Sequence, residues 1–337
     1  MQRGRSGVRH GRARCRPFLP GTRHPQLGRS PNEDGDQIGQ GGRVTSLVPL
    51  FEENQETVWT TRELLAAGWS RRALARAVAD GSLARVRQGR FVAAGTHGDI
   101  VAAARLGGRL DCISLLAMRG VFVHHHPHRH VQQDPFASRR PPAPRDVVYH
   151  WRPSSAPRDC AAVDVVEALA QATRCQPPRS AVATLDNAWH LGLVDEADIA
   201  EVFARIPHRF RALRPLLDSR AEAGTESLVR LLLRQLGCRV ELQVRIDGVG
   251  RVDLLVDGWL IVECDSEQFH GSWPVHKKDR RRDMAALERG YATLRLLAED
   301  ILHHPDRVRA ALERILAHGA PGRSPESSTP RHRDRLT

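Results

Sequence analysis

The sequence predicts a multidomain α+β protein with more than one folded unit. Two observations favour this class. The chain has 337 residues, more than a single hydrophobic core usually organises. Segments with a helical period also alternate with segments of strand-like alternation. Because no apolar run reaches the roughly 18 residues of a membrane-spanning helix, we expect a cytoplasmic protein with no membrane partner.

The chain is strongly basic, with a formal net charge of +12. Nearly all of its positive charge is arginine, because Lys277 and Lys278 are the only lysines. An excess of this size favours a polyanionic partner, and we expect DNA. The alternative is a solvated basic surface that reflects an arginine-rich coding bias.

The two ends of the chain have the composition of disordered segments. Residues 1–45 are rich in Gly, Arg, Pro and His, and residues 319–337 are similarly polar. Such segments bury too little apolar surface to offset the entropy of ordering. A start codon assigned too far upstream would give the first segment the same composition. Its functional alternative is a basic arm that grips DNA.

Residues 46–95 predict a small domain of two helices and a β-hairpin. Thr60 followed by Glu63 is a capping-box pattern that opens the first helix, and Ser70 is a suitable N-cap for the second. Two short strands around a glycine turn follow over residues 83–92. This is the order of a winged helix-turn-helix, whose second helix enters the major groove of DNA.

The second helix and the wing of this domain both carry arginines. The candidate DNA contacts are Arg71, Arg72, Arg76 and Arg87. Arginines in these positions supply phosphate contacts as well as any base readout. Two amphipathic helices and a hairpin also occur in plain interaction modules, and the arginines favour DNA binding over that alternative.

Residues 96–220 predict a mixed α/β region without a clear motif. Its most conspicuous feature is the run His-His-His-Pro-His-Arg-His at 124–130. Neighbouring histidines in a strand point to opposite faces, and no carboxylate or cysteine accompanies them at ligand spacing. The six cysteines of the chain are scattered without a CxxC pair. We therefore expect an exposed, weakly basic strand edge here, and neither a zinc ribbon nor a disulfide framework.

Residues 221–318 contain the pattern that says most about chemistry. Asp253, Glu263 and Asp265 interrupt the otherwise apolar strands of a predicted hairpin. An unpaired ionised carboxylate in a dry interior is strongly destabilising. A bound cation is the simplest way to keep such groups ionised, and carboxylates suit Mg²⁺ or Mn²⁺. The three acids are therefore candidate metal ligands.

The turn of this hairpin decides whether its acids share one face of the sheet. A two-residue loop would pair Val256 with Trp259 and separate the acids onto two faces. A three-residue loop pairs Leu255 with Trp259 and gives Gly258 a left-handed conformation in a bulge. We expect the second register because it places Asp253, Glu263 and Asp265 on one face and Val252, Leu254, Leu260 and Val262 on the other.

Other polar residues lie close to the hairpin in the sequence. Glu226 falls in the first turn of a predicted helix, where a carboxylate favours the helix dipole. His270 could act as a general acid or base. Lys277, Lys278 and Arg282 belong to a charged helix start that either grips phosphate or forms compensating salt bridges.

The predicted order of helix, three strands, helix and strand is that of the PD-(D/E)xK nuclease core. Residues 222–318 resemble the very-short-patch-repair (Vsr-like) endonuclease family, and resemble its large uncharacterised branch more closely. The motifs are Glu226, Gly250-Arg-Val-Asp253 and the segments 261–270, 279–283 and 290–295. The resemblance implies an α/β restriction-endonuclease-like core.

The same resemblance implies roles for the candidate residues. Asp253 would be the principal metal ligand, and Glu263 and Asp265 would complete the metal site. Glu226 would be a supporting acid and His270 the catalytic histidine. The family's lysine is absent, because Asp265 stands at its place. Glu267 and Gln268 also replace the aromatic and His-rich residues of the repair enzymes, so we do not expect specific mismatch repair.

Residues 60–92 are similar to the winged helix of AbiEi-type antitoxins from abortive-infection toxin–antitoxin systems. This second resemblance implies DNA as a partner and a toxin protein as a further candidate partner. The leading hypothesis is a Mg²⁺-dependent DNA endonuclease guided by a winged helix. The alternative is a non-catalytic DNA-binding regulator of antitoxin type, in which the nuclease fold serves as a binding or dimerisation platform.

Overall fold

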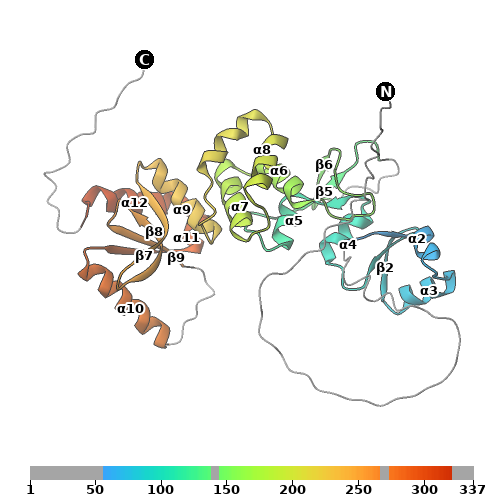
Figure 1. Cartoon of the computed structure of the whole chain (residues 1–337), viewed down its shortest axis with the longest axis horizontal. Helices are drawn as coiled ribbons and strands as arrows, with labels where there is room; N and C mark the ends of the chain where they lie inside the picture. The colour runs from blue at the N-terminus through green and yellow to red at the C-terminus, as the bar shows by residue number, and fades with distance from the viewer. Residues whose placement is uncertain (1–55, 138–143, 266–272, 321–337) are drawn as a thin grey trace, which may run out of the picture. The chain divides into compact units, whose positions relative to one another are not determined.

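The computed structural model describes residues 56–137, 144–265 and 273–320 (Figure 1). Residues 1–45 and nearly all of 319–337, the segments predicted to be disordered, lie outside the described residues. The chain divides into two compact units. The first combines Met1–Ser114 with His128–Asp164, and the second combines Leu115–Pro127 with Val165–Thr337.

The first unit begins with the predicted helices and wing. Its elements are β1 (Trp59–Thr60), α2 (Thr61–Ala66), α3 (Arg71–Ala79), β2 (Leu83–Arg87) and β3 (Arg90–Ala93). The strands form an antiparallel sheet in the order β1-β3-β2. Helix, helix and hairpin therefore occur in the predicted order, and β1 adds a strand that the sequence pattern did not indicate.

Local hydrogen bonds confirm both predicted helix starts. Thr60 Oγ1 accepts from the Glu63 N–H at 3.1 Å, and Glu63 Oε2 accepts from the Thr60 N–H at 2.8 Å. Ser70 Oγ accepts from the Ala73 N–H at 3.0 Å and so caps α3. The two helices pack on the sheet through a buried core of Leu64, Leu74, Ala77, Leu83 and Phe91.

A second sheet completes the first unit. After α4 (Gly98–Arg105) it contains β4 (Arg109–Leu110), β5 (Arg129–Gln133) and β6 (Val147–Trp151) in the order β4-β5-β6. β5 is antiparallel to β4 and parallel to β6. The expectation of an exposed strand edge is wrong for His130, which is 7% exposed because β5 is the central strand.

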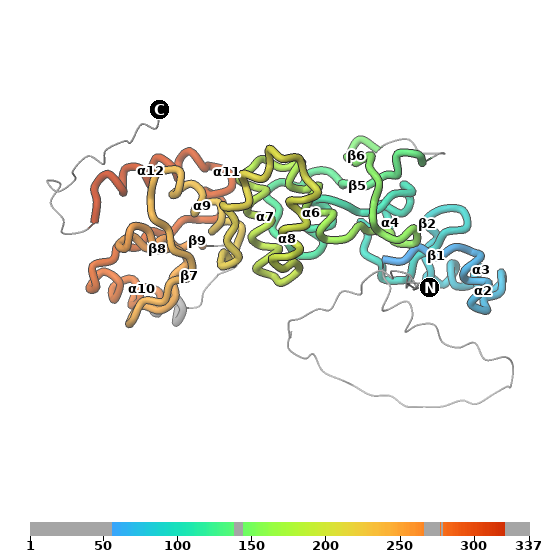
Figure 2. Tube along the Cα trace, turned by 45° about the horizontal axis from the view of Figure 1, so that its top comes forward, coloured from blue at the N-terminus to red at the C-terminus, as the bar shows by residue number. Residues whose placement is uncertain are grey.

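The second unit contains a group of helices before its sheet (Figure 2). They are α6 (Val165–Cys175), α7 (Pro178–His190), α8 (Glu196–Arg205) and the 3₁₀ segment η1 (His208–Leu216), and α5 (Cys112–Met118) precedes them in the chain. None of the helices in the described part of the chain is long and apolar enough to cross a membrane.

The C-terminal elements follow the predicted order of helix, three strands, helix and strand. They are α9 (Gly224–Gln235), β7 (Val240–Ile246), β8 (Gly250–Val256), β9 (Leu260–Asp265), α10 (Trp273–Glu288), β10 (Ala292–Leu297), α11 (Ala298–His303) and α12 (Pro305–His318). The sheet order is β10-β9-β8-β7, with β10 parallel to β9. Residues of α9, α11 and α12 pack on one face of this sheet, and Ala286 of α10 packs on the other.

The observed hairpin register differs from both registers considered for the sequence. Val256 pairs with Leu260, so the loop contains residues 257–259. Gly258 has the predicted left-handed conformation, with φ of 76°. Asp257 also has a positive φ of 49°, and the resulting turn shifts the pairing by two residues along β9. A shift of two residues preserves the face of each side chain, so Asp253 and Glu263 still lie on one face.

One apolar residue lies on the face opposite to its predicted one. Val252 packs with Leu255 and Ile261 rather than with Leu254. The neighbouring β7 strand carries a positive φ of 53° at Gln243, between the pairs Leu242–Leu254 and Val244–Val252. This local irregularity interrupts the alternation of side chains at the level of Asp253.

Candidate DNA-binding surface and carboxylate cluster

The arginines of α3 lie on the exposed side of the winged helix. Leu74 and Ala77 bury the inner face of α3 in the core, with exposures of 5% each. At the helical spacing of 100° per residue, Arg72 and Arg76 fall on the opposite face, and both are exposed. Arg71 is exposed at the flank of the same helix. These three predicted DNA contacts are therefore accessible to a partner.

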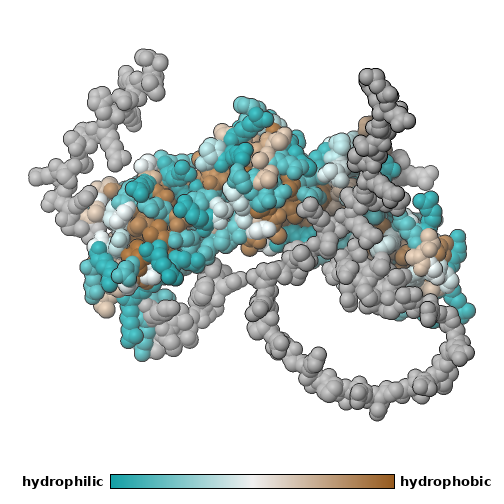
Figure 3. Space-filling model, viewed as in Figure 1, coloured by the Kyte–Doolittle hydropathy of each residue, from teal (hydrophilic) through white to brown (hydrophobic). Residues whose placement is uncertain are grey.

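The wing adds further positive charge beside α3. Arg85, Arg87 and Arg90 are all exposed on β2 and β3, and a β-bulge separates the pairings of Arg85 and Arg87. The surface of the winged helix in Figure 3 is mixed, with hydrophilic residues beside a smaller hydrophobic group. An exposed helix and an exposed wing that both carry arginine match the charge pattern that DNA phosphates attract.

The acids of the winged helix are occupied by local hydrogen bonds. Glu63 belongs to the capping box of α2. Asp80 accepts from the Ser82 hydroxyl at 2.7 Å and the Ser82 N–H at 3.0 Å, and these bonds lower the pKa of Asp80. Both carboxylates therefore serve helix ends, and the charge of Arg76 on α3 also helps to lower the pKa of Asp80.

A basic cavity adjoins the wing within the first unit. It has a volume of about 520 Å³ and is lined by Arg87, Arg90, Arg109 and Arg158, among others. Gly107 lies directly beneath the Arg87 guanidinium, where a side chain would collide with it. Arg109 and Arg158 were not among the predicted residues, because only the packing of the second sheet brings them to the wing.

The hairpin of the second unit brings Asp253 and Glu263 together. Continuation of the Val256–Leu260 pairing places Asp253 directly opposite Glu263. Asp253 Oδ2 accepts from the Cys264 N–H at 3.0 Å. Burial and the negative charge of Asp253 raise the pKa of Glu263 to about 7, although the Arg282 guanidinium opposes that rise. The site therefore holds two carboxyls that disfavour being ionised together.

Glu226 joins this site from the first turn of α9. Its carboxylate accepts from the N–H groups of Glu222 at 3.0 Å and Ala223 at 3.2 Å, and from Gln243 Nε2 at 3.0 Å. The structural role expected from the helix dipole is therefore present. Burial and the charge of Asp253 nevertheless raise the pKa of Glu226 to about 7. Glu226 thus accepts hydrogen bonds at the start of its helix and also interacts electrostatically with Asp253 of the hairpin.

We define the carboxylate cluster as Glu226, Asp253, Glu263 and Asp265, the four acids that act electrostatically on the thiol of Cys264. Burial and the charges of all four acids raise the pKa of this thiol well above its usual range. Asp265 lies at the outer edge, 3.6 Å from a guanidinium nitrogen of Arg295. Among the described residues, these carboxylates do not form one of the groups of three or more side chains that are placed to hold a metal ion together.

The basic residues predicted beside the acids have different environments. Arg282 is directed inward, where it donates to Glu263 Oε1 at 2.8 Å and to the carbonyls of Val249 and Arg251. This ion pair with Glu263 agrees with the compensating salt bridges that the sequence allowed, and a phosphate contact by Arg282 stays a prediction. Lys277 is exposed on α10. His270 and the side chain of Lys278 lie outside the described residues.

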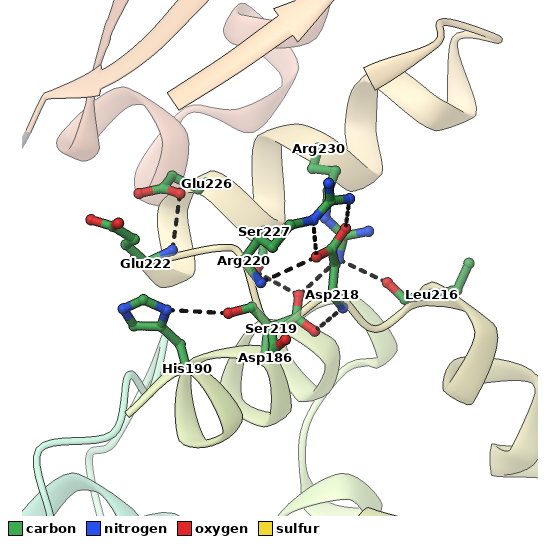
Figure 4. Close-up of polar contacts among 10 residues, drawn as sticks. All are labelled: Asp186, His190, Leu216, Asp218, Ser219, Arg220, Glu222, Glu226, Ser227 and Arg230. Atoms are coloured by element: carbon green, nitrogen blue, oxygen red, sulfur yellow. Dashed lines mark hydrogen bonds and ion pairs between the residues drawn. The ribbon is translucent and has the colours of Figure 1, made fainter. Parts of the chain in front are cut away.

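A buried ion pair that the sequence analysis did not identify holds α9 in place (Figure 4). Asp186 of α7 accepts from Arg230 Nη2 and from Ser227 Oγ, each at 2.7 Å. Arg230 also donates to the Leu216 carbonyl at 2.8 Å. Both charged side chains are at most 2% exposed. This network fixes the position of α9, the helix whose first turn carries Glu226.

Comparison with known proteins finds a family match for the segment that forms the winged helix. Residues 50–92 match the family model described as "Transcriptional regulator, AbiEi antitoxin". The match includes α2, α3, β2 and most of β3, and therefore supports the resemblance of the winged helix to AbiEi antitoxins. It does not include the C-terminal elements on which the nuclease resemblance depends.

Two curated relatives are similar over a longer stretch. Both are uncharacterised proteins of Mycobacterium tuberculosis, from two different strains, and each is 31% identical to this chain over 160 residues. The alignment covers 44% of this chain and 59% of each relative. The chain therefore spans less than two thirds of the length of these relatives.

Proposed function

We propose that this protein is a DNA-binding regulator of antitoxin type. In this proposal α3 enters the major groove and the wing contacts the sugar-phosphate backbone. The observation that carries it is the exposed face of Arg72 and Arg76, within a segment that matches an antitoxin regulator family. The proposal includes a toxin protein as a second partner, because antitoxins act on a cognate toxin.

The salt dependence of DNA binding tests this proposal. Each arginine that neutralises a phosphate contributes about 0.9 to the slope of log K against log salt concentration. The double variant Arg72→Ala/Arg76→Ala should therefore bind a mixed-sequence DNA duplex more weakly and lower the slope by about 2. Fluorescence anisotropy at several salt concentrations measures both quantities.

The matched control is Arg314→Ala, which removes an exposed arginine from α12 in the second unit. It should leave the affinity and the salt slope at their wild-type values. If Arg314→Ala weakens binding as much as the α3 variant, general charge attracts the DNA and the assignment of α3 is wrong. If the assignment of α3 holds, selection of bound sequences from a random pool identifies the operator that the wild type prefers.

The carboxylate cluster favours a second candidate function, metal-dependent hydrolysis of DNA phosphodiesters. Glu226 and Glu263 flank Asp253 with pKa values raised to about 7, so ionisation of all three is unfavourable without a cation. In this proposal Asp253, Glu263 and Asp265 would hold Mg²⁺ or Mn²⁺. The bound ion would supply Lewis-acid activation of water and phosphate.

The chain's own residues would prepare this site. Arg282 holds the Glu263 carboxylate in place, and the Cys264 N–H orients Asp253. The buried ion pair that anchors α9 keeps the Glu226 carboxylate close to Asp253 and Glu263. His270 remains the proposed general acid or base.

Nicking of supercoiled plasmid distinguishes the two candidates. The nuclease proposal expects Mg²⁺- or Mn²⁺-dependent nicking by the wild type and none by Asp253→Asn. The control Asp247→Asn removes an exposed acid in the β7–β8 turn and should nick normally. If wild type, Asp253→Asn and Asp247→Asn all bind DNA and none nicks it, the nuclease proposal is wrong and the regulator proposal stands.

A further inference from the structure

Three potential metal ligands from separate elements of the first unit converge outside both surfaces described above. They are Cys112 at the start of α5, His130 in β5 and His150 in β6. The Cys112 sulfur and one ring nitrogen of each histidine all lie within 4.8 Å of one another. We call this group the Cys–His cluster. Its members are far apart in the sequence and form no spacing motif.

The two histidines meet through the pairing of their strands. In the parallel ladder His150 pairs with Gln132, which is two residues from His130 on the same strand. Side chains two residues apart share a face, so the two imidazoles are diagonal neighbours. His130 Nδ1 lies 3.0 Å from His150 Nε2, and the ring planes are tilted by 50°. Each histidine therefore presents a nitrogen to the other.

Cys112 reaches the histidines through an uncommon backbone conformation. The residue is fully buried and has a φ of 54°, which few residues other than glycine adopt. The buried Asp111 stabilises this conformation, because its carboxylate accepts from the Cys112 N–H at 2.7 Å and from Arg152 at 2.7 Å. Strain of this kind persists where the surroundings hold it, commonly at functional sites.

Hydrogen bonds also fix the histidine strand against the cysteine. The Asp111 N–H donates to the His130 carbonyl at 3.0 Å. Two residues beyond Cys112, the Ser114 hydroxyl accepts from the His130 N–H at 2.7 Å. The residues on both sides of Cys112 are thus bonded to the backbone of His130. These hydrogen bonds hold the Cys112 sulfur beside the His130 imidazole without a bound metal ion.

We propose that the Cys–His cluster binds a zinc ion. Thiolate and imidazole are both ligands that Zn²⁺ accepts, whereas Mg²⁺ prefers oxygen ligands. Bonds of about 2.0–2.3 Å in a tetrahedron put neighbouring ligand atoms roughly 3.3–3.8 Å apart. The two nitrogens, at 3.0 Å, lie slightly closer than that range, and all three ligand atoms lie within 4.8 Å of one another, so the side chains would have to shift to enclose an ion. The alternative is a hydrogen bond between two neutral histidines beside a structural thiol.

Zinc content of the purified full-length chain tests the proposal. The wild type, stripped with chelator and reloaded with ZnSO₄, should hold zinc in competition with a chromophoric chelator. Cys112→Ser and His150→Gln should each lower its affinity by at least about tenfold. Co²⁺ in place of zinc should give tetrahedral absorption with a thiolate charge-transfer band, and Cys112→Ser should lose that band.

Two controls separate the proposal from its alternatives. Cys238→Ser removes a cysteine of the second unit outside the cluster and should bind zinc as the wild type does. His150 is only half-buried, so His150→Gln should keep the wild-type circular dichroism even where Cys112→Ser disturbs folding. A wild type that binds no zinc, or a folded His150→Gln with unchanged affinity, would overturn the proposal.

Discussion

Replacement of Asp253 by asparagine should stabilise the second unit at neutral and higher pH. The change removes one negative charge and hardly alters shape. Asparagine Oδ1 can still accept from the Cys264 N–H, the bond that Asp253 makes at 3.0 Å. Its amide can also donate to the carboxylate of Glu263. The variant therefore isolates the repulsion between Asp253 and its two neighbours, Glu226 and Glu263.

The pKa values of those neighbours set the size of the effect. Each rises from 4.5 to about 7, which corresponds to about 3 kcal/mol against the ionised form in the folded state. Burial is the larger cause, and the charge of Asp253 is the next. We assign about 1 kcal/mol at each carboxyl to Asp253, and expect a total gain of about 1–2 kcal/mol.

The gain should depend on pH in a defined direction. A carboxyl whose folded pKa is raised contributes stability below its unfolded pKa, and that stability is lost as pH rises through the folded pKa. Both glutamates are protonated in the folded state at about pH 5 and ionised at about pH 8. The benefit of Asp253→Asn should therefore be small at the lower pH and full at the higher one.

Thermal unfolding followed by calorimetry measures this difference. The transition of the second unit should rise by about 2–4 °C per kcal/mol in Asp253→Asn at about pH 8. Asp247→Asn, which replaces an exposed acid in the β7–β8 turn, should change little at either pH. An equal gain at both pH values, or a lower transition temperature at about pH 8, would refute the repulsion argument.

Three further changes test the packing that positions the two surfaces. Asp186→Asn leaves Arg230 buried without its counter-charge. The free energy of unfolding should fall by about 3–5 kcal/mol in urea denaturation. A loss below about 1 kcal/mol would contradict a tightly buried ion pair. Ser70→Ala removes the cap on the Ala73 N–H and should destabilise the first unit by about 1 kcal/mol in chemical denaturation. Unchanged stability would show that water replaces the cap. Gly258→Ala adds a methyl group in open space at a residue with φ of 76°. Backbone strain alone should therefore lower the free energy of unfolding by about 1–2 kcal/mol in the same assay. A neutral result would mean that the turn changes its conformation to accept alanine.

The winged helix was predictable because its signals are local. The capping box at Thr60 and Glu63 and the cap at Ser70 involve residues only three apart. The family match at residues 50–92 covers the same segment. What the local pattern missed is β1, which pairs with β3 and closes the small sheet. That pairing depends on residues more than thirty positions apart, for example Trp59 with Phe91.

The predicted carboxylate face was right for a different reason than the one given. The predicted hairpin pairs Leu255 with Trp259, whereas the observed one pairs Val256 with Leu260, and both registers keep the same parity. Loop lengths that keep the same parity put a strand residue on the same face, so Asp253 and Glu263 share a face with either loop, whereas the irregularity at Gln243 moves Val252 to the other face. The sequence left Arg282 between a phosphate contact and a compensating salt bridge, and the fold brings it to Glu263 and to two carbonyls, in agreement with the second alternative.

The sequence by itself determined the order of elements, the helix caps, the arginines of α3 and the acids of the hairpin. Each of these follows from residue types within one turn or one strand, where spacing fixes geometry. Only the tertiary structure decided which distant groups meet: Asp186 with Arg230, and Cys112 with His130 and His150. Such contacts depend on which helices and strands pack together, and no short-range spacing in the sequence specifies that choice.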